Sequence, residues 1–475
     1  MYRNLFPSCS LPDGVTEEEY LQQLCEERGA VRYGKQMQRM DVLERLHYEL
    51  DLLKCTGFTK DFLLIMGIID YAKRNGIAVG PGRDWQPSSL VAYILGITEI
   101  DPLCYGLFFE MWLNPERVTV PSIEVDVACN HRDELLRYLR RKYGEHSVSP
   151  VRFSNWPHFP SSAPNLACAE ALPKNGQAPE AKVDPSGVAI SIGRLADIVP
   201  MTVDEQGHSM TQHARFLMET LGCLVLDLHP HKILAVNQSV LTLVREVKGV
   251  DISLNHLSLG DRNTYKMLGQ GHILGVLPVD SSLAANTCRR IKPSRIQDIA
   301  ALVAFSALGS EDYIALYAAR KRQESPISYE HHLLEPILRE TYGIMVYREQ
   351  YVQALELLAG YTRGRADLLR RAIPKKHPLL LMANYLPAFV KDCARSSNIP
   401  EHAAIHLFNY LNIGAGHCFP KSYAVSSSLL AYQTAYLKAH YPLEFYSALL
   451  EHHCDAPEYV FRIKEEMASF SWRTM

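Results

Sequence analysis

The stretch NPERVTVPSIEVDVAC, residues 114–129, places two carboxylates, Glu124 and Asp126, two positions apart in a run rich in β-branched residues. On a β-strand this spacing puts both side chains on one face of the sheet. Two carboxylates that close repel each other unless a cation lies between them. Their oxygen ligands favour Mg²⁺ or Mn²⁺, and phosphoryl-transfer enzymes hold two metals with such pairs. An edge strand with a polar outer face explains the pair equally well.

The composition indicates a globular protein. With 475 residues the chain is long enough for two or three domains, and 47% hydrophobic residues without a long apolar run exclude a membrane span. The N-terminal MYRNLFPSCSLPDG lacks the features of a secretory signal, so we expect a cytoplasmic protein. Eleven scattered cysteines without a C-x-x-C pair favour reduced thiols over disulfides or zinc. Because the net charge is only −3, nucleic-acid binding requires local basic patches.

Residues 15–78 read as helices. The segment TEEEYLQQLCEERG begins with Thr16 as a helix N-cap followed by acidic residues, and LLIMGIIDYAKRNG predicts a buried helix that ends at Gly76. Further along, DELLRYLRRKYG predicts an amphipathic helix. The pattern then breaks, because the residues from about 150 to 182 are rich in Pro, Ser, Ala and Asn and show no period. This composition predicts a linker.

After the linker the chain returns to regular structure. The segment GVAISIG predicts a strand, and LGCLVLDLHPHKILAVNQSVLTLVREV predicts a strand that ends at Asp227 and is followed by a helix. From about residue 240 onward the sequence is helical, with basic clusters at 289–295, 320–322 and 370–376. Any one such cluster is, by itself, most simply a solvated helix face.

The segment VGPGRDWQPSSLVAYILGITEIDPLCYGLFFEMWLNPERV, residues 79–118, resembles the palm domain of the bacterial replicative DNA polymerase III alpha subunits, the family C polymerases. Two later segments are similar to the same family. They are YGIMVYREQYVQALELLAGYTRGRADLLRRAIPKK, which resembles the fingers motif, and GHCFPKSYAVSSSLLAYQTAYLKAHYPLEFYSALL near the C-terminus. The resemblance covers about residues 5 to 460, with a gap near 150–182 where the family has a helical thumb.

The resemblance implies an α+β fold, in which a nucleotidyltransferase-type palm with a small mixed sheet precedes a large helical fingers domain and the thumb is largely missing. The implied domains are the helical part of the palm at 1–78, the first palm half at 79–149, a linker at 150–182, the second palm half at 183–240 and the fingers-like domain at 241–475. The implied function is template-directed nucleotidyl transfer to a primer 3′-hydroxyl by a two-metal mechanism with Mg²⁺ or Mn²⁺.

The resemblance also implies which residues carry this chemistry. The metal-binding and catalytic residues are Glu124 and Asp126 on the first strand and Asp227 on the second; without the resemblance, Asp227 reads equally well as a helix N-cap. The residues implied to bind the nucleotide are Gly82, Arg83, Arg370, Arg371, Lys375, Lys421 and Ser422. Arginine and lysine on a helix suit phosphate oxygens. The tyrosines Tyr432, Tyr436 and Tyr441 remain ordinary helix packing.

Several departures from the family pattern point to impaired activity. Asp84 and Trp85 stand where the family has the Gly-Ser pair that holds the triphosphate, so they add a like charge and a bulky ring. Glu124 replaces an Asp, Val225 replaces a Lys and Pro230 replaces a Gly. The alternative function is therefore a catalytically degenerate palm–fingers scaffold that binds nucleic acid or a protein partner.

The implied partners are a DNA primer–template, deoxynucleoside triphosphates and other replication or repair polymerase subunits, with no membrane. The resemblance further implies a bacterial protein of DNA replication. Both function hypotheses require nucleic-acid binding through the basic residues of the fingers-like helices.

Overall fold

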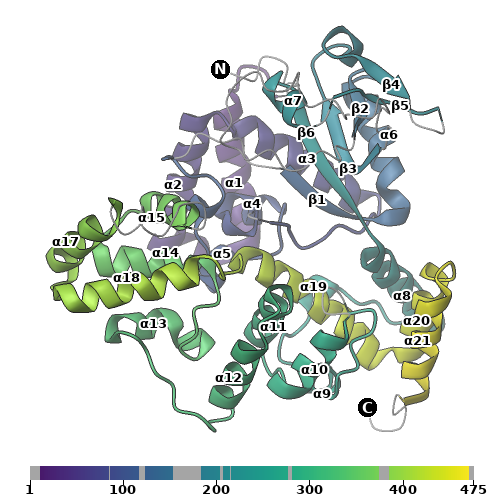
Figure 1. Cartoon of the computed structure of the whole chain (residues 1–475). Coiled ribbons are helices and arrows are strands. Elements are labelled where there is room, and N and C mark those ends of the chain that lie inside the picture. The colour runs from purple at the N-terminus through teal and green to yellow at the C-terminus, as the bar shows by residue number, and fades with distance from the viewer. Residues whose placement is uncertain are drawn as a thin grey trace, which may run out of the picture. The chain divides into compact units, whose positions relative to one another are not determined.

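The computed structural model describes residues 11–84, 86–116, 123–152, 183–203, 207–213, 215–276, 281–373 and 384–469. The chain divides into two compact units. One unit comprises Ser122–His231 and the first ten residues, and the other comprises Leu11–Pro121 and Lys232–Met475 (Figure 1). Residues 11–121 belong to the same unit as the C-terminal helices, and the palm and fingers boundaries expected from the sequence stay a prediction. The α+β fold class is confirmed.

The smaller unit is built on a mixed four-stranded sheet. Its strands lie in the order β1-β6-β3-β2, and only the β1–β6 pair is parallel. The elements of this unit are β1 Ile123–Ala128, η4 Cys129–His131, α6 Arg132–Tyr143, β2 Val148–Arg152, β3 Val183–Ile190, η6 Leu195–Asp197, β4 Met201–Val203, β5 Ser209–Thr211, α7 Arg215–Thr220 and β6 Leu224–His231. Strand β2 occupies the first residues of the predicted linker; the prediction for the rest of that segment lies outside the described residues.

Strand β1 confirms the strand predicted from the β-branched run. Ile123, Val125 and Val127 alternate with the two carboxylates and are 2%, 5% and 0% exposed, so one face of the strand is packed. A side chain of this size contributes about 1.5–3 kcal/mol when it is fully buried. The helix predicted from DELLRYLRRKYG follows as α6, which ends before Gly144 and packs on β2 and β6.

Strand β6 is longer than the sequence predicted. We expected it to end at Asp227, but it continues to His231, because its parallel pairing with β1 extends as far as Ala128 opposite His231. The next helix, α8, begins only at Lys232. Asp227 therefore lies in the interior of a strand, and the helix N-cap interpretation of this residue is wrong.

The N-terminal helices of the larger unit follow the sequence signals closely. Thr16 and Glu19 form a capping box at the start of α1, as the Thr followed by acidic residues predicted. The helix predicted to end at Gly76 ends two residues earlier, at Arg74. The elements of this segment are α1 Glu17–Tyr33, η1 Gly34–Gln38, α2 Met40–Thr56, α3 Thr59–Arg74, η2 Gln86–Ser88, α4 Leu90–Leu95, α5 Pro102–Tyr105 and η3 Phe109–Met111.

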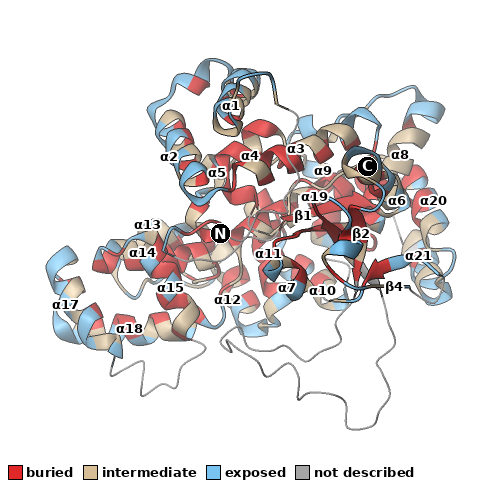
Figure 2. Cartoon of the chain, turned by 90° about the horizontal axis from the view of Figure 1, so that it is seen from above, coloured by how far each residue is buried: buried red, intermediate tan, exposed pale blue. Residues whose placement is uncertain are grey.

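The C-terminal part of this unit is helical, as predicted. Helix α19 is almost entirely buried and packs against α11 around Phe305, Ala424 and Val425 (Figure 2). The elements are α8 Lys232–Lys248, η7 Leu254–His256, α9 Arg262–Gln270, α10 Ser282–Ile291, α11 Ile296–Leu308, α12 Glu311–Lys321, η8 His332–Leu334, α13 Glu335–Leu338, η9 Arg339–Thr341, α14 Arg348–Ala359, α15 Arg363–Ala372, α17 Leu386–Ser397, α18 Glu401–Ala415, α19 Lys421–His440, α20 Pro442–His452 and α21 Pro457–Ser469.

Two further properties concern the described residues as a whole. None of the helices described has the length and apolar character needed to cross a bilayer. The nine cysteines in the described part of the chain are all free thiols.

A buried carboxylate on α2 fixes the loop that precedes α4. Glu49 is fully buried, and its oxygens accept hydrogen bonds from the backbone N–H groups of Leu90 and Val91 and from the Ser89 hydroxyl, at 2.9, 3.1 and 2.7 Å. Arg45 balances its charge at 2.6 Å and also donates to the carbonyl of Ser88. The carboxylate therefore joins α2 to the N-terminus of α4.

We predict that Glu49→Gln lowers the free energy of unfolding by about 3 kcal/mol, because it leaves the guanidinium of Arg45, whose side chain is only 12% exposed, without its counter-charge. Urea denaturation of the two proteins measures the difference. The control is Glu44→Gln, an exposed residue on the same helix, which should change stability by less than about 0.5 kcal/mol. Equal small effects of the two substitutions would contradict this account of the α4 loop.

Candidate metal centre

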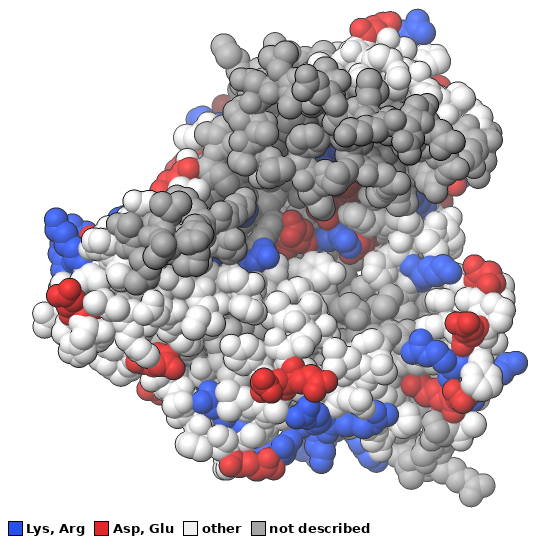
Figure 3. All heavy atoms as spheres, viewed as in Figure 1, with Lys and Arg blue, Asp and Glu red and all other residues white. Residues whose placement is uncertain are grey.

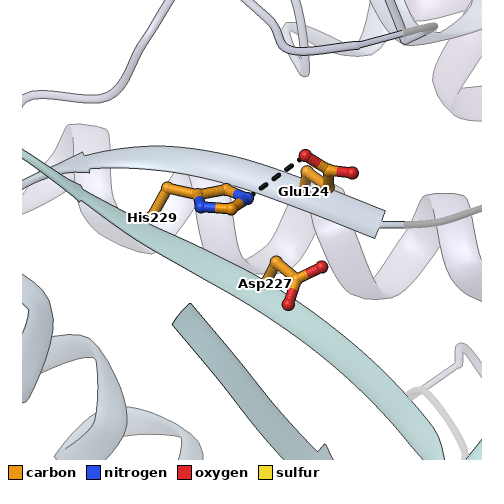
Figure 4. A group of neighbouring side chains, drawn as sticks. All are labelled: Glu124, Asp227 and His229. Carbon is orange, nitrogen blue, oxygen red and sulfur yellow. Dashed lines mark hydrogen bonds and ion pairs between the residues drawn. The ribbon is translucent and has the colours of Figure 1, made fainter. Parts of the chain in front are cut away.

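The parallel β1–β6 pair brings carboxylates from distant parts of the chain together. In the register of this pair Glu124 lies opposite Asp227, and Asp126 lies opposite His229. Suitable ligand atoms of Glu124, Asp227 and His229 all lie within 4.8 Å of one another. Figure 4 shows these three side chains on neighbouring strands. The group has the size and the donor atoms of a metal-binding site.

His229 is the member of this group that the sequence analysis missed. Its Nε2 lies 3.1 Å from Oε2 of Glu124, and both side chains are partly exposed, at 25% and 19%. His229 follows Asp227 by two positions, which is the same spacing that singled out Glu124 and Asp126. The sequence carries this signal, but a strand that ends at Asp227 leaves His229 outside it, whereas β6 continues to His231.

Asp227 is the buried member of the group. Its side chain is only 5% exposed, and it pairs with the guanidinium of Arg215 at the start of α7, which also binds Glu219 at 2.7 Å. Burial raises the pKa of Asp227 above its ordinary value, and the nearby Glu124 adds to the rise, while Arg215 and His229 oppose it. A nearby cation stabilises the ionised form of such a carboxylate, and Arg215 supplies that cation.

Asp126 lies two residues beyond Glu124 on the same face of β1 and is 9% exposed. It is not a member of the group whose ligand atoms lie within 4.8 Å of one another. The structure thus brings together two of the three predicted carboxylates, and the role of Asp126 as a metal ligand stays a prediction.

The donor set fits a divalent cation. Two carboxylates provide hard oxygen ligands of the kind that Mg²⁺ and Mn²⁺ prefer, and the imidazole adds a nitrogen ligand that suits later transition metals better than Mg²⁺. A metal ion would have to compete with Arg215 for Asp227, since both are cations directed at the same carboxylate.

The loop with the predicted nucleotide-binding residues Gly82 and Arg83 belongs to the larger unit. Pro81 is held by Thr98, whose hydroxyl donates to the Pro81 carbonyl at 2.6 Å. Gly82 has a φ of 125°, and a Cβ atom there would lie 2.4 Å from the Thr98 hydroxyl, so only glycine fits. Asp84 has a φ of 50° in the left-handed region. Backbone geometry thus explains the glycine at position 82 independently of any ligand.

Arg370 and Arg371 share one buried carboxylate. Asp367 is 0% exposed and accepts hydrogen bonds from Arg370 at 2.7 and 3.1 Å and from Arg371 at 2.7 Å. Burial lowers the pKa of Arg348 on the adjacent helix α14, and the positive charges of Arg370 and Arg371 lower it further. Three guanidinium groups therefore lie within electrostatic range of one another. Lys375 lies outside the described residues.

Lys421 and Ser422 begin helix α19. Their backbone N–H groups donate to the fully buried carboxylate of Glu349, at 2.8 and 3.2 Å, and burial raises the pKa of that carboxyl. The ammonium group of Lys421 pairs with Glu340 at 2.7 Å, and the lysine side chain is only 10% exposed. Glu349 thus binds the N-terminus of α19 and Glu340 pairs with the Lys421 side chain. Only the tertiary contacts reveal this arrangement.

A small mixed sheet with a carboxylate–imidazole cluster, together with a helical unit rich in internal arginine pairs, defines an α+β protein with a candidate acidic metal site. Residues 19–155 match the bacterial DNA polymerase III alpha NTPase domain, and residues 234–396 match the bacterial DNA polymerase III alpha subunit finger domain. These matches include Glu124, Asp126, Arg370 and Arg371, whereas Asp227 lies between them.

Curated relatives of the chain are DNA polymerase III alpha subunits as well. The chain is 36% identical over 464 residues to the DNA polymerase III subunit alpha of Thermus aquaticus, and 32% identical to those of Bacillus subtilis and Aquifex aeolicus. These alignments cover 86%, 94% and 94% of this chain. The chain belongs to the family of bacterial DNA polymerase III alpha subunits. It spans 38%, 44% and 45% of the length of these three relatives.

We predict that Glu124→Gln and Asp227→Asn each weaken Mn²⁺ binding by more than about 100-fold, because each removes a charged ligand. Loss of a residue that only contacts a ligand costs roughly 10–100-fold in affinity. Electron paramagnetic resonance of free Mn²⁺ in a titration measures the affinity. Asp126→Asn tests the third carboxylate in the same way, and a comparable loss would make it a ligand.

The matched control is Asp133→Asn, which removes an exposed carboxylate on α6 and should leave Mn²⁺ affinity unchanged. Arg215→Gln should strengthen binding, since it removes the cation that competes for Asp227. If Mn²⁺ binds equally to all of these proteins, the cluster is not a metal site.

Proposed function

We propose that this chain catalyses template-directed nucleotidyl transfer from a deoxynucleoside triphosphate to a primer 3′-hydroxyl. The observation that carries the proposal is the register of β1 and β6, which sets Glu124 beside Asp227 in a member of a polymerase family. Phosphoryl transfer needs little covalent chemistry from the protein and depends on positioning and charge. A carboxylate cluster of this kind suits that task.

Bound divalent ions would supply activation of the attacking hydroxyl and neutralisation of charge on the phosphates. In the proposal Glu124 and Asp227 hold these ions, with Asp126 as a further candidate ligand. His229, whose Nε2 lies 3.1 Å from Glu124, would add a nitrogen ligand to these oxygen ligands. Arg215 balances the charge of Asp227 when no ion is bound. His229 favours Mn²⁺ relative to a site built from oxygen ligands alone.

The arginine cluster of the larger unit provides the proposed triphosphate site. Asp367 fixes the guanidinium groups of Arg370 and Arg371, and one carboxylate against two guanidinium groups leaves a positive charge for phosphate oxygens. Arg348 adds a third guanidinium in the same electrostatic neighbourhood. Gly82 and Arg83 remain candidates for contact with the nucleotide. Lys421 can bind the triphosphate in this proposal only after its ion pair with Glu340 breaks.

The proposed substrates are a primer–template DNA and deoxynucleoside triphosphates, and the proposed partners are other polymerase subunits. Because the chain spans less than half the length of the relatives reported above, the activity and assembly of those whole proteins are proposals for this chain. A cytoplasmic location is part of the same proposal.

Primer extension by the purified chain with Mg²⁺ or Mn²⁺ tests the proposal. We expect extension to fall by about 100-fold or more in Asp227→Asn, which corresponds to about 2.7 kcal/mol of lost transition-state stabilisation. Asp133→Asn should retain full activity. Absence of extension by the unmodified chain under both metals would overturn the proposal and leave the scaffold alternative.

A second prediction concerns the loop before α4. Asp84→Gly with Trp85→Ser should raise the affinity for a deoxynucleoside triphosphate by roughly tenfold, or ~1.4 kcal/mol, because it removes a negative charge beside the triphosphate. Glycine at position 84 carries no backbone strain, since the φ there is 50°. Isothermal titration calorimetry measures the affinity.

The two single variants separate the charge at position 84 from the side-chain bulk at position 85. If the double variant stays folded and its affinity is unchanged, the loop does not limit nucleotide binding.

A further inference from the structure

Two basic segments that are separate in the sequence meet on one surface of the helical unit. Helix α10 packs against α12, and the end of α12 reaches back to the end of α10. Arg322 donates to the carbonyl of Arg290 at 2.6 Å, and Lys321 donates to the carbonyl of Lys292 at 2.7 Å. We call the resulting surface the α10–α12 patch; it consists of Arg290, Lys292, Arg295, Arg320, Lys321 and Arg322.

Figure 3 shows Lys and Arg side chains gathered on the face that carries α10 and α12 in Figure 1. Tyr342 links the two segments further, because Arg320 donates to its carbonyl at 2.9 Å and Arg295 lies 3.3 Å from its hydroxyl. The patch is thus a continuous feature of the tertiary structure, whereas the sequence shows only two unrelated clusters.

Acidic groups balance only part of this charge. Asp298 pairs with Lys321 at 2.6 Å and with Arg295 at 3.3 Å, and Glu324 pairs with Arg322 at 2.7 Å. The ion pairs of the patch thus engage two carboxylates for six cations. The whole chain has a net charge of −3, so the patch is a local exception.

Helix capping explains some of these cations but not all of them. Lys321 and Arg322 donate to backbone carbonyls near the end of α10, where cations are favourable. The side chains of Arg290 and Lys292 are exposed and have no hydrogen-bond or ion-pair partner among the described residues. These two cations remain available to a ligand.

This arrangement contrasts with that of the predicted nucleic-acid-binding residues. Arg370 is 5% exposed and shares Asp367 with Arg371, and Lys421 is paired with Glu340. Exposed cations without a carboxylate partner bind phosphates at the least cost, because no internal ion pair has to break. Compared with Arg370 and Lys421, the exposed cations at the end of α10 can therefore bind a phosphate backbone at a lower cost.

We propose that the α10–α12 patch binds the phosphate backbone of duplex DNA, independently of the nucleotide sequence. Single-strand sites usually combine basic residues with aromatic rings on which bases stack. The ring that meets this patch, Tyr342, has its face occupied by the Arg295 guanidinium at 5.5 Å. A basic patch whose neighbouring ring, Tyr342, is already covered by a guanidinium suits a duplex, whose bases are already stacked. The proposal concerns binding and does not depend on the metal centre.

The test uses the double variant Arg290→Gln, Lys292→Asn of the full chain. Asparagine is chosen because Lys292 has a φ of 48°, which asparagine adopts readily. Fluorescence anisotropy with a labelled duplex of arbitrary sequence gives the affinity across a range of NaCl concentrations. Loss of two phosphate contacts should make the plot of log K against log salt shallower by about 1.8.

The matched control is Lys391→Gln, Lys464→Gln, which removes two exposed cations on α17 and α21 that also lack a partner among the described residues. Its slope should stay within experimental error of the unmodified chain. An unchanged slope in the Arg290→Gln, Lys292→Asn variant would overturn the proposal, and so would an equal change in both double variants.

A single strand of the same length forms the second arm of the test. A loss confined to the single strand would overturn the assignment to duplex DNA. Loss of primer extension in a variant with intact duplex binding would concern the proposed catalysis alone, so the two proposals fail in distinguishable ways.

Discussion

The register of the parallel β1–β6 pair is the constraint on which the candidate metal centre depends. Glu124 and Asp227 lie on strands separated in the sequence by helices α6 and α7 and by strands β2 to β5, yet backbone hydrogen bonding sets them side by side. A shift of one residue would turn the carboxylates of one strand to the packed face. Val125 and Val127 oppose such a shift, because they would then leave the core.

Buried carboxylates organise the larger unit in the same way at several places. Glu49 and Glu349 accept backbone N–H groups at helix N-termini, and Asp367 holds two arginines. A buried charge is tolerated only when it is paired or hydrogen-bonded. Each of these carboxylates therefore pairs with backbone N–H groups or arginines that could otherwise bind an external anion. This internal pairing determines which basic residues remain free at the surface.

The residues that depart from the family pattern lie in both units. Asp84 has a left-handed backbone and attracts Arg348, and Pro230 lies in strand β6 between His229 and His231. Proline lacks a backbone donor, but its carbonyl still accepts. Pro230 does not interrupt the pairing of β6 with β1, which continues to His231.

The sequence by itself determined the α+β class, the helices α1 and α6, the strand with Glu124 and the family, because periodicity, capping residues and motifs are local properties. It did not determine the length of β6, the place of His229 beside Glu124 or the internal pairing of Arg370, Arg371 and Lys421. Nor did it show that residues 289–295 and 320–322 form one surface. Only the tertiary structure decided these points, since each depends on contacts between residues that are distant in the chain.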